Sequence, residues 1–333
     1  MAEQIDDYFT SVVSALTPGA GRSSVRPEDP IRPPSPLSVQ GALDLFDAQL
    51  GSRHLDLAAR WLRSQGEGFY TIGSSGHEGN AAVAAALRPT DPSLLHYRSG
   101  GFFLARAQQV DGTDPLRDVL LGVVAATEEP ISGGRHKVFG RHDLGIIPQT
   151  STVAAHLPRA GGVAGSIARA PKVHVPSLWP ADAVAVCSFG DASANHSTAV
   201  GAINTAIHSA YQGLPLPLLF VCEDNGIGIS TKTPMGWIAA NFGDRAGLEY
   251  FEADGSDLPA AYATAKRAAD WVRSNRKPAF LHLRTVRLMG HAGSDLESAY
   301  RTSAEITADF DRDPVLCTAK LLIGGGHLSP TEI

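Results

Sequence analysis

The sequence predicts an α/β protein built around a doubly wound parallel sheet. Residues 183–189 and 216–222 are short, continuously apolar runs, which is the pattern of parallel strands covered on both faces. Residues 198–211, between them, place apolar side chains at helical intervals. We therefore expect one βαβ unit with a right-handed connection. Residues 248–253 and 279–286 predict further strands, and the alternation of strands with helices favours a doubly wound sheet.

Composition and charge exclude several classes of function. Hydrophobic residues make up 43% of the 333 residues, so the chain can bury a large core in one domain or two. The net charge of -6 comes without a basic block, which argues against a nucleic-acid partner. No apolar run reaches the length of a membrane span, and the acidic start MAEQIDDYF is unlike a targeting peptide, so we expect a cytoplasmic protein. Three scattered cysteines predict neither a disulfide framework nor a zinc site.

The chain begins with a segment that we expect to lie outside the main domain. Residues 1–36 end in RPEDPIRPPSP, and this density of proline prevents both a helix and a strand ladder, which predicts a flexible or extended arm. The main domain is expected to cover residues 37–323. Ser38 is the predicted N-cap of its first helix, whose apolar side chains recur as far as residue 62.

Two segments before the central strands carry candidate site residues. His77 lies in a glycine-rich turn before an alanine-rich helical pattern at 78–87. It could equally contact a cofactor or substrate, or serve as a cap or packing residue. Tyr97 and Arg98 lie in a loop before another predicted helix. An arginine guanidinium can bind phosphate through two hydrogen bonds, and a surface ion pair with a carboxylate is the alternative.

The segment SGGRHKVFGRHDLGIIPQ has no periodicity and is predicted to be a loop. Its residues His136 and His142 could meet a substrate carboxylate. Residues 157–170 follow as a glycine- and alanine-rich helical pattern, which suits tight helix packing. The pattern is no dinucleotide fingerprint, because its glycine spacing is wrong and no strand leads into it. A Rossmann-type dehydrogenase therefore fits poorly.

Polar groups follow both central strands at their carboxyl ends. Asp191 comes after the first strand and Asn225 after the second, and in an open parallel sheet such ends line the ligand crevice. Carboxylate and amide oxygens suit Mg²⁺, which takes the rest of its octahedral shell from water and substrate phosphate. Gly190 allows the backbone to approach a ligand, and the following helix N-terminus favours an anion. These residues predict a metal-bound diphosphate, although Gly-Asp and Asn-Gly turns also occur for turn chemistry alone.

These motifs resemble those of a known family. The pair GDASAN and EDNGIGIS is similar to the thiamine-diphosphate motif, which has a Gly-Asp-Gly opening and an Asn-Asn-Gly-like close. Residues 37–306 as a whole resemble the alpha subunit of the decarboxylating first component of 2-oxo acid dehydrogenase complexes. Ala192 stands where glycine is commonest, and the loop YQGLPLP lengthens the separation of the two motifs. The methyl group of Ala192 and the longer loop each have a small energetic cost, so neither departure argues against the resemblance. The resemblance implies a thiamine-diphosphate-binding, transketolase-like fold.

The resemblance also implies roles for individual residues. The Mg²⁺ ligands would be Asp191, Asn225 and the backbone carbonyl of Ile227, where the family often has tyrosine. His291, in the motif GHAGSD, falls on the position of the family's active-site histidine. The resemblance further implies that the diphosphate is bound by Tyr97, Arg98, Gly190 and Ala192. It implies that the aminopyrimidine is bound by Ser151 and Val153. The residues expected to order the loop of His291 are Asp295, Tyr300 and Arg301.

The activity that the resemblance implies is oxidative decarboxylation of a 2-oxo acid, with transfer of the acyl group to the lipoyl domain of a second enzyme. In the family, a glutamate of the beta subunit activates the aminopyrimidine, and this sequence contains no pyrimidine-binding half. We therefore expect a beta subunit or a fused beta module as partner, in an α₂β₂ assembly or a fused dimer. Residues 324–333 suggest a truncated or fused chain, because Ser329 and Pro330 resemble the start of a new helix.

Two other classes of function stay open. A thiamine-dependent ketol- or acyltransferase would share the diphosphate site and use a different acceptor. A non-catalytic relative would keep the fold as a regulatory or structural partner. The sequence does not show whether the substrate is pyruvate or a branched-chain 2-oxo acid, because these differ by only a few methylene groups. As a whole it resembles the branched-chain enzymes somewhat more.

Overall fold

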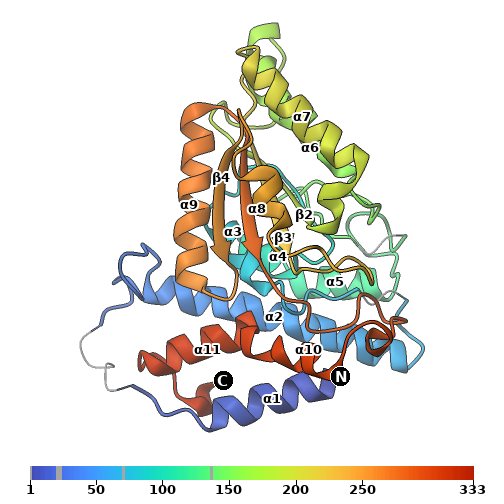
Figure 1. The fold of residues 1–333 in the computed structure, drawn as a ribbon, viewed down its shortest axis with the longest axis vertical. Coiled ribbons are helices and arrows are strands. Elements are labelled where there is room, and N and C mark those ends of the chain that lie inside the picture. The colour runs from blue at the N-terminus through green and yellow to red at the C-terminus, as the bar shows by residue number, and fades with distance from the viewer. Residues whose placement is uncertain (1, 20–24, 70–71, 136–137) are drawn as a thin grey trace.

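The computed structural model, which describes residues 2–19, 25–69, 72–135 and 138–333, contains a five-stranded parallel sheet. The strands follow the order β1-β2-β3-β5-β4, and every neighbouring pair is parallel. Their bounds are β1 Ser93–Leu94, β2 Ala185–Gly190, β3 Leu218–Asp224, β4 Glu249–Asp254 and β5 Ala279–Arg284. Helices cover both faces of the sheet (Figure 1), which confirms the predicted doubly wound α/β fold.

The helices alternate with the strands as the sequence predicts, with ends shifted by a few residues. The α-helices are α1 Ala2–Ser14, α2 Val39–Ser64, α3 Ala81–Ala85, α4 Gly100–Ala107, α5 Pro115–Val123, α6 His156–Arg169, α7 Ser197–Tyr211, α8 Trp237–Phe242, α9 Leu258–Asn275, α10 Ser303–Ala308 and α11 Pro314–Gly324. The 3₁₀ segments are η2 Glu78–Asn80, η3 Ala170–Val173, η4 Ala192–Asn195, η5 Glu297–Ala299, η6 Phe310–Arg312 and η7 Pro330–Glu332.

Alternate residues of the central strands face opposite sides of the sheet, and each side has its own core. On one side, Val186 and Leu219 belong to a cluster with helices α2, α3, α4, α9 and α11. On the other side, Cys187 and Phe220 pack with α6, α7 and α8. Cys187 and Cys222 are buried, and burial raises the pKa of both thiols, which is the behaviour of small core residues rather than of reactive ones.

Residues 2–14, expected in a flexible arm, form helix α1, so that expectation is wrong for this part of the chain. Ile5 and Val13 are buried, and α1 packs against α11 from the other end of the sequence (Figure 1). The proline-rich segment that follows is tied to the start of α9, where the Ser35 hydroxyl donates to the Pro259 carbonyl at 2.7 Å. The division into residues 1–36, 37–323 and 324–333 stays a prediction.

Side-chain caps fix the starts of three helical segments. Ser38 accepts the Gly41 N–H at 3.0 Å at the start of α2, as predicted. Asp257 accepts the Ala260 N–H at 3.2 Å and so caps α9. Ser329 caps η7 through a capping box, which confirms that a helical turn begins there. Each cap satisfies a backbone donor that would otherwise lack a partner within its helix.

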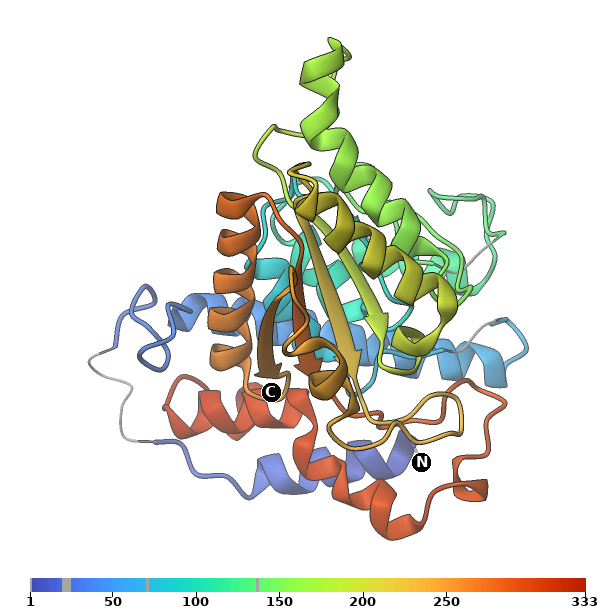
Figure 2. The same ribbon diagram turned by 45° about the horizontal axis from the view of Figure 1, so that its top comes forward.

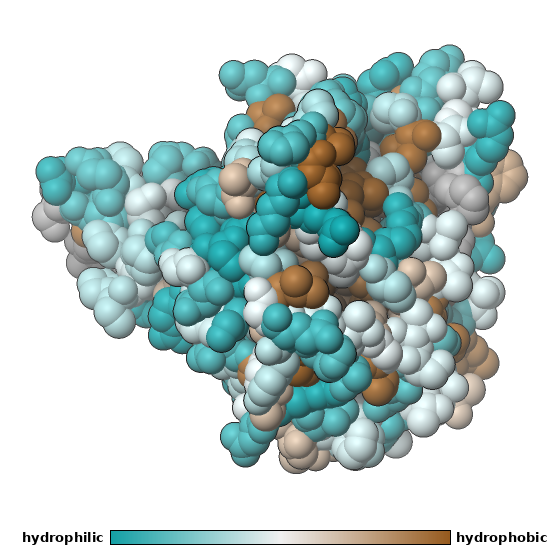
Figure 3. Space-filling model, turned by 90° about the horizontal axis from the view of Figure 1, so that it is seen from above, coloured by the Kyte–Doolittle hydropathy of each residue, from teal (hydrophilic) through white to brown (hydrophobic). Residues whose placement is uncertain are grey.

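Hydrophilic side chains cover most of the face seen in Figure 3, with smaller groups of hydrophobic side chains between them. Three exposed hydrophobic residues lie in the loops that follow β3 and β5, namely Ile229, Met235 and Leu296. Across the described parts of the chain, no helix combines the length and the apolar character needed to cross a membrane.

A buried ion cluster joins α2, η2 and α11. The Arg53 guanidinium donates to Glu78 Oε1 at 2.8 Å and to the two Asp313 oxygens at 3.0 and 2.8 Å. All three side chains are almost fully inaccessible to solvent. Glu78 Oε2 also accepts the Gly76 N–H at 2.6 Å. The cluster therefore fixes the turn that carries His77.

Replacing Arg53 with methionine is expected to lower the free energy of unfolding by about 3–5 kcal/mol, because two buried carboxylates lose their cationic partner. Urea denaturation followed by circular dichroism measures this loss. The matched control is Arg26→Met, since Arg26 pairs with Glu28 and Asp29 at the surface, where solvent screens the charges, and its loss is expected to leave the free energy of unfolding nearly unchanged. Equal losses for the two variants would contradict the assignment of Arg53 to a buried cluster.

Candidate active site

The carboxyl ends of β2 and β3 form the base of the candidate site. The two strands are paired in parallel, with Gly190 opposite Glu223, so Asp191 and Asn225 follow at the same edge of the sheet. In Figure 2 the strand arrows point toward the loops that follow them. Gly228 lies in the loop after β3, where a Cβ atom would come within 3.1 Å of the Ala192 Cβ. The loops after the two strands therefore pack closely together.

A cavity of about 400 Å³ opens at this edge. All ten residues that the sequence analysis assigned to cofactor, metal or catalysis line it: Tyr97, Arg98, Ser151, Val153, Gly190, Asp191, Ala192, Asn225, Ile227 and His291. The other lining residues are Ile72, His96, Ser193, Gly228, Ile229 and Arg287. The fold thus brings residues from widely separated segments to one cavity.

Asp191 supplies a buried carboxylate to the cavity, with only 1% of its surface exposed. Burial raises the pKa of Asp191 to about 6, and a hydrogen bond from the Thr233 hydroxyl offsets this only in part. An ionised carboxylate in this position is stabilised by a bound cation. Carboxylate, amide oxygen and backbone carbonyl are ligands that suit Mg²⁺, so the residues present fit that ion.

His77 contacts Asn225 and does not line the cavity. Its Nε2 lies 2.9 Å from Asn225 Nδ2, and its Nδ1 lies 2.8 Å from Glu223 Oε2. The side chain is fully buried, and burial lowers the pKa of His77 to about 4, so the ring is neutral at pH 7. His77 is therefore a packed residue that contacts one predicted metal ligand.

Sequence reasoning missed two buried residues of the site: His96, which lines the cavity, and Glu223, which lies behind it. Glu223 accepts hydrogen bonds from Ser99 and Asn80 besides its contact with His77. Burial alone would raise the pKa of Glu223, but its interactions with His77 and His96 outweigh burial and hold the pKa below its usual range. Neither His96 ring nitrogen has a hydrogen-bond partner among the described residues. The available signal for Glu223 was a carboxylate directly after the apolar run LLFVC.

Arg98 and His291 lie together on the cavity wall. Arg98 Nη1 donates to the Gly73 carbonyl at 2.6 Å, and its Nη2 lies 2.9 Å from the His291 carbonyl oxygen and 3.1 Å from His291 Nδ1. Burial, followed by the charges of Arg98 and Arg287, lowers the pKa of His291 to about 4. A neutral ring that accepts at Nδ1 carries its proton on Nε2. His291 is therefore a hydrogen-bond donor through Nε2.

The loop of His291 is ordered by the residues expected to do so. Asp295 Oδ2 accepts the His291 N–H at 2.6 Å and the Tyr300 hydroxyl. Arg301 pairs with Glu297 at 2.7 Å. Arg287, which the sequence analysis did not identify, donates to the carbonyl oxygens of residues 228 and 229, and so ties this loop to the one after β3.

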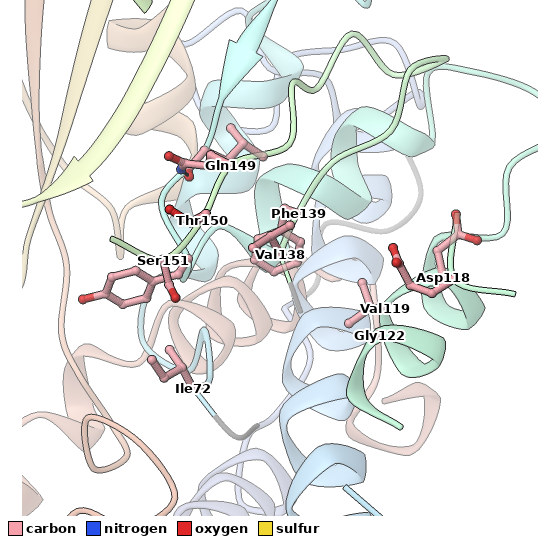
Figure 4. A pocket seen from close by; sticks show the side chains of 12 residues that line it. Ile72, Asp118, Val119, Gly122, Val138, Phe139, Gln149, Thr150 and Ser151 are labelled. Carbon is pink, nitrogen blue, oxygen red and sulfur yellow. Dashed lines mark hydrogen bonds between the residues drawn. The ribbon is translucent and has the colours of Figure 1, made fainter. Parts of the chain in front are cut away.

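A second, largely apolar pocket adjoins the cavity and shares Ile72, Tyr97 and Ser151 with it. In Figure 4, Val138 and Phe139 lie between Ser151 and Val119 of α5. The remaining lining residues are Leu95, Asp118, Gly122, Glu129, Gln149 and Thr150. The pocket provides apolar surface next to the candidate site.

The loop before α6 carries the two histidines that were expected to be able to meet a substrate carboxylate, His136 and His142. His136 lies outside the described residues. His142 is almost fully exposed, with Nδ1 3.5 Å from Asp143 Oδ1, and it does not line the cavity.

Comparisons with known proteins agree with this geometry. The family model described as "Dehydrogenase E1 component" matches residues 48–333. The 2-oxoisovalerate dehydrogenase subunit alpha of Bacillus subtilis (strain 168) is 28% identical over 302 residues, which cover 88% of this chain and 85% of that protein. The mitochondrial 2-oxoisovalerate dehydrogenase subunits alpha of Caenorhabditis elegans and Mus musculus are 30% and 29% identical, over 75% and 73% of this chain. The chain spans 54% and 52% of the length of these two relatives. Because the family model matches most of the sequence, the chain belongs to the dehydrogenase E1 component family.

Proposed function

We propose that the chain is the alpha half of a thiamine-diphosphate- and Mg²⁺-dependent 2-oxo acid dehydrogenase, which decarboxylates a 2-oxo acid oxidatively and passes the acyl group to a lipoyl domain. The observation that carries the proposal is the convergence of all ten predicted site residues on one cavity at the carboxyl edge of the sheet. Relatives named for 2-oxoisovalerate dehydrogenase support the same activity.

In this proposal, Mg²⁺ is held by Asp191, the Asn225 amide oxygen and the Ile227 carbonyl. The metal would neutralise the buried Asp191 carboxylate and hold the diphosphate at the carboxyl ends of β2 and β3. Arg98 and Tyr97 would bind the diphosphate beside Gly190 and Ala192, because a guanidinium fork matches phosphate oxygens.

Ser151 and Val153 would position the aminopyrimidine. When bound, thiamine diphosphate supplies the nucleophilic carbon and the electron sink for decarboxylation. His291 would donate a hydrogen bond from Nε2 to a cofactor phosphate or to the reacting carboxylate. Its neutral state at pH 7 suits that task. The loop network around Asp295 keeps the ring oriented.

The proposed partners are a beta subunit or fused beta module, which supplies the activating glutamate, and the lipoyl domain of the acyltransferase component. Ile229, Met235 and Leu296, exposed in the loops beside the cavity, offer apolar surface for such a partner. We also propose that the protein is cytoplasmic. The names of the relatives favour a branched-chain 2-oxo acid as the substrate.

An electron-acceptor assay tests the proposal. The chain, alone and with its beta partner, is given thiamine diphosphate, Mg²⁺ and either 2-oxoisovalerate or pyruvate, and substrate-dependent reduction of an artificial acceptor is followed. We expect turnover only with the partner present, and faster turnover with 2-oxoisovalerate. Full turnover by the isolated chain would contradict the half-site model. Cofactor binding without acceptor reduction would favour a transferase, and absence of cofactor binding would favour a non-catalytic relative.

A further inference from the structure

The Asn225 side-chain amide has a hydrogen-bond partner at each of its two ends. An asparagine side chain ends in a carbonyl oxygen, which can coordinate Mg²⁺, and an NH₂ group, which cannot. The two ends have nearly the same shape, so neighbouring hydrogen-bond partners decide between the two orientations. The described neighbours of the Asn225 amide are the His77 ring, 2.9 Å from Nδ2, and the Ile227 N–H, 3.0 Å from Oδ1.

Glu223 determines the tautomer of His77. Its carboxylate is completely buried, lies 2.8 Å from His77 Nδ1, and accepts from Asn80 Nδ2 at 3.1 Å and from the Ser99 hydroxyl at 3.0 Å. Because a carboxylate only accepts, the His77 proton must be on Nδ1. The Ile227 N–H donates to Asn225 Oδ1, so the Asn225 NH₂ group is the end that faces His77 Nε2. Because an NH₂ group only donates, Nε2 is the acceptor of this pair, and an acceptor at Nε2 cannot bind the amide oxygen.

The position of His77 is itself fixed from several sides. The turn before it is held by the Gly76 N–H bond to Glu78, and Glu78 is anchored to Arg53. Gly76 has a φ of 96°, and a Cβ atom there would lie 2.3 Å from the Val286 carbonyl oxygen. The ring therefore has little freedom to move away from Asn225.

We propose that His77 and Glu223 form an orienting pair that holds the Asn225 NH₂ group inward and so presents the amide oxygen to the metal of the proposed active site. This inference rests on the proposed function, since it assigns positioning residues to that Mg²⁺ site. His77 does not line the cavity, and in this proposal it acts through Asn225.

The test compares two substitutions of nearly equal size at His77. Glutamine can donate through its NH₂ group to Glu223 and accept through its oxygen from Asn225, so H77Q reproduces both hydrogen bonds. Leucine fills similar space and reproduces neither. In the assembly with its beta partner, calorimetric titration of thiamine diphosphate at several Mg²⁺ concentrations gives the metal affinity. We expect H77L to weaken it about 10- to 100-fold and H77Q to stay within about threefold of the wild type.

A double-mutant cycle separates orientation from general damage to the site. In an Asn225→Asp background, the side chain presents an oxygen in either orientation, so adding H77L should not weaken the Mg²⁺ affinity by more than about threefold. An equal loss in both backgrounds would overturn the proposal, and so would an H77L affinity equal to that of the wild type. If the wild type itself bound no Mg²⁺ and thiamine diphosphate, the proposed function would fail instead.

A spectroscopic measurement on the wild type is independent of whether H77L folds. Long-range ¹H–¹⁵N correlation spectra of the ¹⁵N-histidine-labelled chain distinguish a proton on Nδ1 from one on Nε2, and the signal of His77 is assigned by its absence in H77Q. We expect a neutral ring with the proton on Nδ1. A proton on Nε2 would overturn the proposal, because the amide oxygen of Asn225 would then face His77.

Discussion

Replacing Asp191 with asparagine is expected to abolish Mg²⁺-dependent binding of thiamine diphosphate and to lower 2-oxo-acid turnover by about a thousandfold or more. The buried carboxylate is the only anionic group among the three predicted metal ligands, and asparagine keeps its shape while removing the charge. The loss should appear in calorimetric titrations of the cofactor as well as in the acceptor assay.

The free energy of unfolding of the Asp191→Asn variant shows whether a loss of cofactor binding could instead come from misfolding. The pKa of Asp191 is raised from its usual 3.8 to about 6 in the folded state, so the native chain binds this proton more tightly than the unfolded chain does. This difference in proton binding adds about 3 kcal/mol to the free energy of unfolding below pH 3.8. The added stability is lost as the pH rises from 3.8 to about 6. Without cofactor at pH 8, Asp191→Asn should therefore be at least as stable as the wild type. A variant that binds cofactor normally would contradict the assignment of Asp191 to the metal.

Replacing Arg98 with methionine is expected to weaken thiamine diphosphate binding by at least about a hundredfold, because a charged two-point contact to the diphosphate is lost. Turnover should fall further, since Arg98 also holds the His291 ring and backbone. Arg98→Lys keeps the charge without the planar fork, and its affinity should lie between those of the wild type and the methionine variant.

Titration with thiamine, which lacks the diphosphate, identifies the contact that Arg98 makes. If Arg98 binds the diphosphate, its replacement should leave the weak affinity for thiamine unchanged within about threefold. Equal losses for thiamine and thiamine diphosphate would contradict a diphosphate contact and would indicate that Arg98 only supports the loop of His291.

The sheet and its cavity could be predicted because their signals are local in the sequence. Each central strand is a continuous apolar run, and the residue after it must lie at the carboxyl edge of a parallel sheet. Asp191 and Asn225 were therefore placed correctly from the residues themselves. Tyr97, Arg98, Ser151, Val153 and His291 were placed by resemblance, since their segments meet the cavity only through the folded topology.

The features that sequence reasoning missed depend on distant partners. Helix α1 packs against residues about 300 positions away in the sequence: Val13 belongs to the same core as α11, and Ile5 packs with Phe310 and with the segment after β5. The role of His77 depends on Glu223 and Asn225, which the fold brings to its two ring nitrogens from almost 150 residues away. Glu223 stands within an apolar strand, where a buried carboxylate is stable only because several donors converge on it.

The central claim is that the cavity after β2 and β3 binds thiamine diphosphate through Mg²⁺. Calorimetric titration of thiamine diphosphate into the chain with its beta partner, in Mg²⁺ and again in excess chelator, tests it most directly. We predict saturation at one cofactor per chain in Mg²⁺, and loss of binding both in chelator and in the Asp191→Asn variant. Binding that persists unchanged in chelator, or no binding in Mg²⁺, would contradict the claim.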